Sequence, residues 1–156
     1  VVMGIDFYPT LVELAGGKPK KYKTDGESLV PVIFEKRGLD RESVYWHFPA
    51  YLQAYNGLQD DSRDRAFRSR PVTVIRKGDW KLLMFHEEWV LDGGREKLDT
   101  NNAVELYNLK DDLGESNNLV KTEFEKRDEL LDQLLNWVDE TNAPIPTEAN
   151  IEYLKN

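Results

Sequence analysis

The most regular alternation of apolar and polar positions lies between residues 71 and 85. Pro71 to Ile75 and Trp80 to Phe85 predict two antiparallel strands, because β-branched and aromatic residues dominate both runs. Arg76-Lys-Gly-Asp79 between them is typical of a tight turn in which Gly78 takes a positive φ angle. This hairpin is the clearest β signal in the chain.

Two further segments predict strands that would extend the hairpin into a sheet. Ser43 to Phe48 is rich in β-branched and aromatic residues, and Ala103 to Leu109 alternates between two faces. Side chains alternate across a strand, so Tyr45 and His47 are expected on one face of the first strand and Trp46 on the other.

Helical signals lie on both sides of these strands. Asp6 to Ala15 predicts a short helix with Asp6 as its N-cap, and a second short helix is expected from Ser28. Thr122-x-x-Glu125 predicts a capping box that opens a long helix ending near Glu140. The predicted fold is α+β: a four-stranded antiparallel sheet packed against a long C-terminal helix, with short N-terminal helices.

Two stretches lack periodicity. Pro49 to Arg70 is long enough to suggest either a working surface loop or a mobile one. Glu87 to Asn102 is a polar stretch through Gly93-Gly94, for which no helix or strand is predicted.

Composition and charge narrow the class of protein. The 156 residues suit one domain, or one domain plus a piece of a neighbour, and 40% hydrophobic with 32% charged residues is typical of a folded chain. The formal net charge of −8 disfavours a nucleic-acid partner, and no apolar run approaches the ~20 residues of a membrane span. The abrupt apolar start at Val1 suggests a chain cut from something longer.

Few residues offer catalytic or metal-binding chemistry. There is no cysteine, which excludes disulfides and thiolate ligands. His47 and His86 stand 39 residues apart without an acidic cluster at ligand spacing, so no metal site is predicted and no Ser/His/Asp arrangement can be assigned. The acidic doublets at 60–61 and 111–112 are expected in turns.

One segment reverses the local sign of the charge. Six basic residues stand against one acid between Arg63 and Lys77. The interpretation favoured by such a cluster is a solvated face that balances neighbouring acids. His47 lies where its strand must end before a long loop, a common position for binding groups, but on its own a single histidine near a loop favours a structural role.

Six motifs occur in a defined order along the chain. They are Asp6–Gly16, Asp25–Pro31, Tyr45–Pro49, Ile75–Leu83, Glu105–Leu109 and Glu115–Leu119. In this order and spacing they resemble the C-terminal region of sulfatases of the alkaline-phosphatase-like superfamily, over residues 4 to about 140.

The resemblance implies that the chain contains parts of two sulfatase domains. Residues 1–42 would be the end of the larger sulfatase domain and a connector, and residues 43–156 the C-terminal sheet-and-helix subdomain. In such sulfatases the N-terminal domain carries a Cys-x-Pro-Ser-Arg or Ser-x-Pro-Ser-Arg motif, whose first residue is oxidised to formylglycine, and the ligands of a calcium ion. This chain contains neither. No catalytic residue, metal ligand or cofactor is therefore assigned to it, and it is expected to be inactive alone.

The resemblance also suggests candidate substrate contacts, because the loops of this subdomain border the cleft in the family. His47 is the first candidate, and Arg65, Arg68 and Arg70 could bind sulfate or uronate groups through the planar guanidinium. The family often has a second histidine where this chain has Ala50. The implied partners are the N-terminal sulfatase domain and a sulfated small molecule or glycan, in a periplasmic or secreted protein.

Two other functions fit the sequence. The chain could be a self-contained sugar-binding module that uses Trp46, Tyr51 and Tyr55 as an aromatic platform. It could also be the tail of a related phosphonate or phosphodiester hydrolase.

Overall fold

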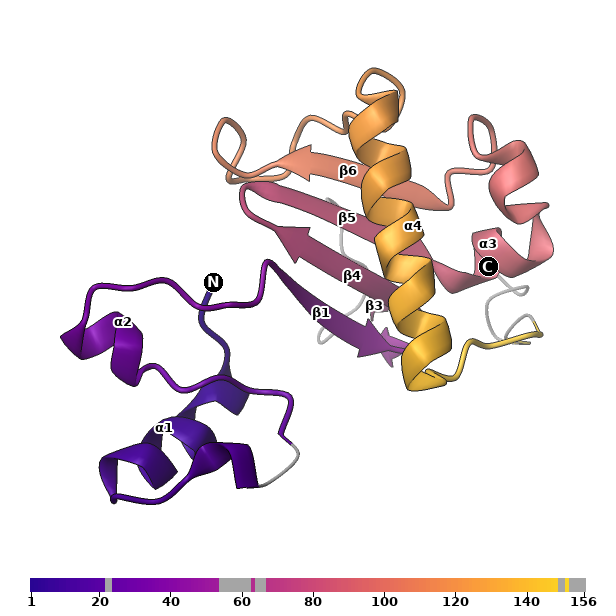
Figure 1. Ribbon diagram of the computed structural model, residues 1–156. Coiled ribbons are helices and arrows are strands. Elements are labelled where there is room, and N and C mark those ends of the chain that lie inside the picture. The colour runs from indigo at the N-terminus through magenta and orange to yellow at the C-terminus, as the bar shows by residue number, and fades with distance from the viewer. Residues whose placement is uncertain (22–23, 54–62, 64–66, 149–150, 152–156) are drawn as a thin grey trace. The chain divides into compact units, whose positions relative to one another are not determined.

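A computed structural model describes residues 1–21, 24–53, 63, 67–148 and 151 (Figure 1). The chain divides into two compact units, Val1–Val44 and Tyr45–Asn156. Arg65, Tyr55 and the doublet at 60–61 lie outside the described residues.

The first unit is helical, as predicted. It contains the 3-10 helices η1 (Gly4–Asp6) and η2 (Pro19–Lys21) and the α-helices α1 (Phe7–Leu14) and α2 (Val30–Phe34). Gly16, with φ of 79°, follows α1 in the left-handed conformation that ends many helices.

Asp6 is the N-cap residue of α1, as predicted, but its side chain makes no capping hydrogen bond to the helix. Its carboxylate is fully buried and accepts two hydrogen bonds of 2.5 Å from the guanidinium of Arg41. The Met3 and Glu27 amides donate to the same carboxylate at 2.7 and 3.1 Å. The Arg41 bond lowers the pKa of Asp6 to about 2, despite the opposing effect of burial. The residue therefore joins three segments of the first unit.

The second unit is a sheet covered by a helix, which confirms the predicted fold class. Its four antiparallel strands lie in the order β1-β4-β5-β6. Their bounds are β1 Ser43–Phe48, β4 Val72–Lys77, β5 Trp80–Phe85 and β6 Val104–Asn108. A separate two-stranded sheet pairs β2 (Leu52–Gln53) with β3 (Phe67–Ser69).

The pairing of the strands places apolar side chains in rows, which form the core of the second unit. Ile75 of β4 pairs with Leu82 of β5, which pairs with Leu106 of β6, and all three side chains are fully buried. Antiparallel partners share a face of the sheet, so these residues form one apolar row. The neighbouring row is Thr73, Met84 and Val104. Thr73 is the polar member of this buried face.

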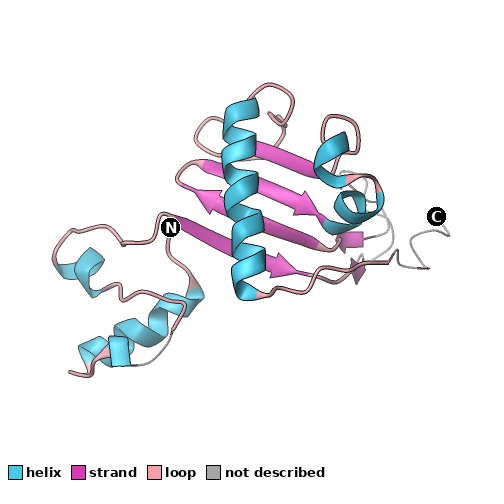
Figure 2. Ribbon diagram, turned by 45° about the vertical axis from the view of Figure 1, so that its right-hand side comes forward, coloured by secondary structure: helices cyan, strands magenta, loops and turns pink. Residues whose placement is uncertain are grey.

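Helix α4 (Phe124–Thr141) crosses one face of the sheet and contacts β4 and β5 (Figures 1 and 2). Its buried apolar residues are Leu130, Leu131, Leu134 and Val138. The capping box expected at Thr122 is absent, because the Thr122 hydroxyl donates to the Leu119 carbonyl at 3.2 Å in the preceding turn.

The polar stretch after β5, for which the sequence predicted no helix or strand, contains two short helices. They are α3 (His86–Leu91) and η3 (Gly94–Lys97). The Asn101 amide fastens this segment by donating to the carbonyls of Asp92 and Gly94 at 3.1 and 2.8 Å. Among the helices described, none is long and apolar enough to cross a lipid bilayer.

Candidate functional site

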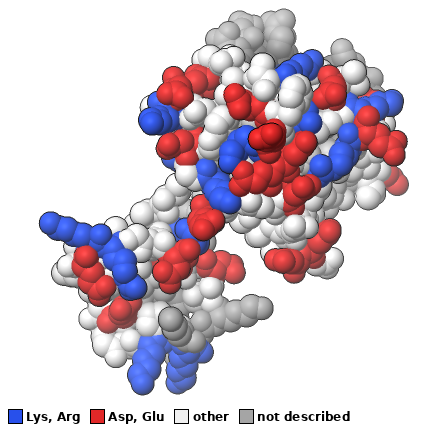
Figure 3. Space-filling model, turned by 45° about the horizontal axis from the view of Figure 1, so that its top comes forward, with Lys and Arg blue, Asp and Glu red and all other residues white. Residues whose placement is uncertain are grey.

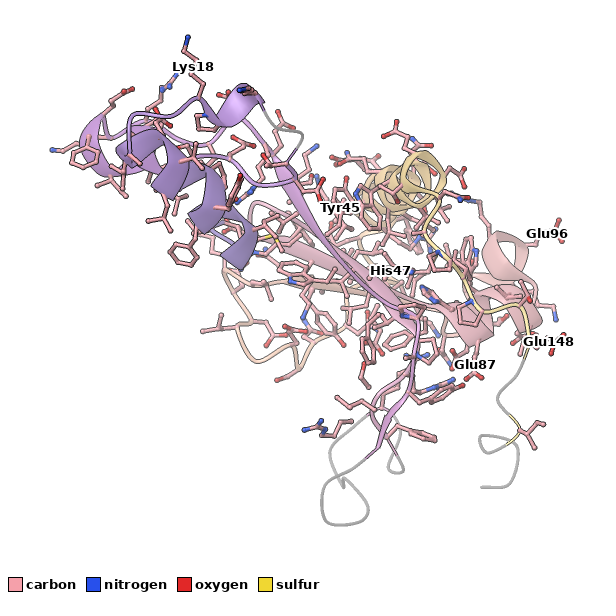
Figure 4. The ribbon with its side chains drawn as sticks, turned by 90° about the horizontal axis from the view of Figure 1, so that it is seen from below. Lys18, Tyr45, His47, Glu87, Glu96 and Glu148 are labelled. Atoms are coloured by element: carbon pink, nitrogen blue, oxygen red, sulfur yellow. The ribbon has the colours of Figure 1, made fainter. Side chains whose placement is uncertain are left out.

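His47 lies on β1 with its side chain on the face that carries Tyr45, as Figure 4 shows along the strand. The Tyr45 ring stacks on Trp137 of α4, with centroids 4.8 Å apart and planes 5° apart. The His47 ring lies 6.3 Å from the same indole. Trp46, on the opposite face, is 42% exposed. The two faces of β1 therefore differ as predicted, and His47 faces α4.

Both ring nitrogens of His47 have hydrogen-bond partners. Nδ1 lies 2.8 Å from the hydroxyl oxygen of Thr73 on β4, and Nε2 lies 3.0 Å from the Pro144 carbonyl, beyond the end of α4. The same Thr73 hydroxyl lies 2.7 Å from Nε2 of His86, the first residue of α3. The two imidazole centroids are 5.4 Å apart. One buried hydroxyl thus joins the only two histidines of the sequence.

His86 is fully buried. Burial, with a smaller contribution from the neighbouring His47, lowers the pKa of His86 to about 4. Its Nδ1 has no hydrogen-bond partner within the part of the chain that the structure describes. His86 is therefore a neutral imidazole at neutral pH, and Thr73 holds it through one nitrogen.

The predicted arginine contacts separate into two environments. Arg70 is only 6% exposed, and its guanidinium pairs with Glu87 at 2.9 Å and Glu88 at 2.6 Å, both on α3. Arg68, two residues earlier on β3, has an exposed side chain. The structure therefore places Arg70 in a buried ion pair and Arg68 at the surface.

Other basic residues of the same segment also face acids. Arg63 bonds Glu105 at 2.5 Å, and Lys77 bonds Glu129 at 3.1 Å. The Arg63 guanidinium also lies 3.8 Å above the centroid of the Phe85 ring, within range of a cation–π contact. On the face shown in Figure 3, acidic and basic side chains adjoin one another. The charge-balancing interpretation of this segment holds for these two residues.

A metal ion has no cluster of ligands among the residues that the structure describes. Within the described ranges, no group of three or more His, Cys, Asp or Glu side chains is arranged to hold one. Asp111 and Asp112 lie in a turn, where Asp112 accepts the Asn117 amide at 2.7 Å and Asp111 accepts the Asn108 side chain at 2.8 Å.

The structure gives only partial support for a sugar-binding platform of exposed aromatic side chains. Trp46 is exposed, but Tyr51 is half-buried and its ring packs against Phe67 with centroids 4.7 Å apart. Tyr55 lies outside the described residues.

Sequence reasoning did not find the part played by Thr73 and His86. Thr73 was only one polar residue in a β-strand pattern, and His86 stood 39 residues from His47. The available signal was the alternation of β4, which puts Thr73 on the same face as Ile75. The contact between Thr73 and His47 depends on β4 lying next to β1, and a local sequence pattern does not show which strands are neighbours.

The class defined by this fold is an α+β subdomain with a four-stranded antiparallel sheet under one long helix. No protein family model matches the chain. It is 32% identical over 155 residues to a sulfatase of Formosa agariphila, a match that includes 90% of this chain and 23% of that protein.

Solved structures share the fold. BT4656, in complex with its substrate D-glucosamine-2-N,6-O-disulfate, gives a TM-score of 0.57 at 24% identity, over 93% of this chain and 25% of that one. A putative sulfatase from Bacteroides thetaiotaomicron gives 0.57 at 22% identity, over 94% and 27%. The chain spans about a quarter of the length of the relatives it matches. It is homologous to sulfatases and corresponds to a sulfatase subdomain.

Proposed function

We propose that this chain is the C-terminal subdomain of a sulfatase and completes a cleft for a sulfated carbohydrate. The observation that carries the proposal is the homology to a sulfatase over 90% of the chain. The reaction centre would lie in the remainder of the enzyme, since the chain spans only 23% of that relative.

The substrate class is supported by two structures of similar fold. One is a complex with a disulfated glucosamine, and the other is BT1596, a 2-O GAG sulfatase that gives a TM-score of 0.54 at 22% identity. A sulfate group offers only acceptor oxygens, which favours N–H donors of the kind that histidine and arginine supply. The proposed substrate is therefore a sulfated sugar.

His47 and Arg68 are the proposed contacts among the described residues. His47 is half-buried near the end of β1, and Arg68 is exposed on β3. Since His47 Nε2 now bonds Pro144, a substrate oxygen would take the place of that carbonyl. We assign Arg70 a structural role instead, because its guanidinium already binds Glu87 and Glu88. Arg65 is retained as a sequence-based candidate.

The proposed partner is the N-terminal sulfatase domain of the same protein. Helix α1 presents Phe7, Tyr8, Leu11 and Leu14 to solvent, and all four side chains are more than half exposed. Apolar residues grouped on one helix usually mark an interaction surface. Formylglycine and calcium would be supplied by that domain.

The test compares this chain alone with the complete polypeptide that contains it. The 156-residue chain, given an aryl sulfate and calcium, should release no sulfate, whereas the complete polypeptide should hydrolyse a sulfated sugar. Turnover by the chain alone would overturn the dependence on another domain. A formylglycine-bearing complete polypeptide that is inactive on every sulfate ester would overturn the sulfatase assignment.

A further inference from the structure

We infer that Thr73 and His86 are positioning residues that hold His47 as the tautomer with its proton on Nε2. The functional part of this inference rests on the proposed place of His47 in the substrate cleft. It adds two buried residues to that site, and it fixes the kind of ligand atom that His47 can meet.

The hydrogen-bond direction is set first at Pro144. A carbonyl oxygen can only accept, and His47 Nε2 lies 3.0 Å from it, so Nε2 must carry the proton. A neutral imidazole has one N–H, which leaves Nδ1 of His47 as an acceptor.

Thr73 then has a single possible role. Its oxygen lies 2.8 Å from His47 Nδ1, so the hydroxyl donates its one hydrogen there. The oxygen must accept from its other neighbour, His86 Nε2, at 2.7 Å. His86 is therefore also protonated on Nε2. The three hydrogen bonds then run in one direction, from His86 to Thr73, from Thr73 to His47, and from His47 to the Pro144 carbonyl.

The opposite direction is disfavoured at both ends. It would set a bare nitrogen of His47 against the Pro144 carbonyl, so that two lone pairs would face each other. It would also move the His86 proton to Nδ1, for which no acceptor exists among the residues described. A buried N–H without an acceptor is costly. The observed contacts thus select one of the two directions.

This series of hydrogen bonds is buried at its His86 end. Thr73 and His86 have no exposed surface, and Thr73 sits on an inner strand, opposite Met84 of β5. At the other end, His47 is only half-buried, and its Nε2–H points to an exchangeable partner, the Pro144 carbonyl. The ligand that this group fits is an acceptor oxygen, such as that of a sulfate or sulfamate group on a sugar.

Nitrogen NMR tests the tautomer directly. The chain has only two histidines, so His86→Gln assigns both imidazoles. In the 156-residue chain near neutral pH, His47 should show a protonated Nε2 and a bare Nδ1. Thr73→Ser should keep this pattern, whereas Thr73→Val should shift His47 toward a mixture. A His47 protonated on Nδ1 in the unaltered chain would overturn the inference, even if Thr73→Val failed to fold.

Kinetics of the complete polypeptide test the functional part. Thr73→Val should raise KM for a sulfated glucosamine about two- to tenfold, the range of one hydrogen bond, and Thr73→Ser should restore it. An unchanged KM despite a shifted tautomer would overturn the positioning role. The NMR result needs no turnover, so it can fail while sulfatase activity, and hence the proposed function, stands.

Discussion

Tyr45 lies flat against Trp137, with ring centroids 4.8 Å apart and planes within 5° of parallel. This contact joins the edge strand β1 to helix α4 two residues before His47. It therefore holds in place the part of β1 that carries His47.

A double-mutant cycle measures this contact. Tyr45→Ala and Trp137→Ala should show a coupling free energy of about 0.5–1.5 kcal/mol in urea unfolding, the range of stacked aromatic pairs. Leu113 is almost fully exposed, so Tyr45→Ala and Leu113→Ala should be additive and serve as the control. Additivity of the aromatic pair would show that the stacking contributes nothing to stability.

His86 should make the second unit sensitive to mild acid. Its pKa is about 4 in the folded chain and about 6.5 when unfolded, so the unfolded state binds the proton first as the pH falls. The stabilisation is complete above pH 6.5 and is lost progressively down to about pH 4. Unfolding free energy should fall by about 2 kcal/mol between pH 7 and pH 4.5.

Tryptophan fluorescence is the appropriate probe, because all four tryptophans lie in the second unit. His86→Gln should remove most of the pH dependence in this window. Equal stability of the unaltered chain at both pH values would mean that His86 takes up a proton without cost.

Arg68 and Arg70 should respond differently to truncation. Arg70→Ala leaves Glu87 buried without a guanidinium that now lies 2.9 Å away, and should destabilise the fold by about 3–5 kcal/mol. Arg68→Ala, on an exposed side chain, should cost less than about 1 kcal/mol and should instead weaken substrate binding. Thermal unfolding of both variants separates these outcomes, and equal losses would contradict the assignment.

Gly26 is required by a close backbone approach in the first unit. A Cβ placed there would lie 2.1 Å from the Ile5 carbonyl oxygen, so Gly26→Ala should destabilise this unit by about 1–3 kcal/mol. Gly38→Ala is the matched control, since nothing lies within 4 Å of the position that its new methyl group would take. Hydrogen exchange of amides 1–44 should accelerate only in Gly26→Ala, and equal exchange in both variants would exclude the steric cause.

The sequence predicted correctly those strands and helices that depend on short local patterns. The hairpin from β4 to β5 followed from alternation and from Gly78, which has the expected positive φ of 58°. Helix α4 was predicted with nearly its observed bounds, although the capping box expected at its start is absent. Helix α3 was missed because six residues cannot hold a helix by propensity, and its Glu87 and Glu88 are held by Arg70, which follows β3.

The site could be predicted only in part. His47 was identified from its position near the end of a strand, but its neighbours depend on β4 lying next to β1 and on α3 beginning at His86. Likewise, nothing in the sequence separated Arg68 from Arg70, because burial and the acidic partners of Arg70 come from tertiary packing. The sequence shows which chemical groups a residue carries, but not which residues it contacts in the folded chain.

We propose that this subdomain binds substrate while the reaction occurs elsewhere in the enzyme. The steady-state kinetics of His47→Ala in the complete polypeptide, with a sulfated glucosamine as substrate, test this division. His47→Ala should raise KM and leave kcat nearly unchanged, the behaviour of a lost binding contact. A collapse of kcat with KM unchanged would place His47 in the chemical step and overturn the proposal.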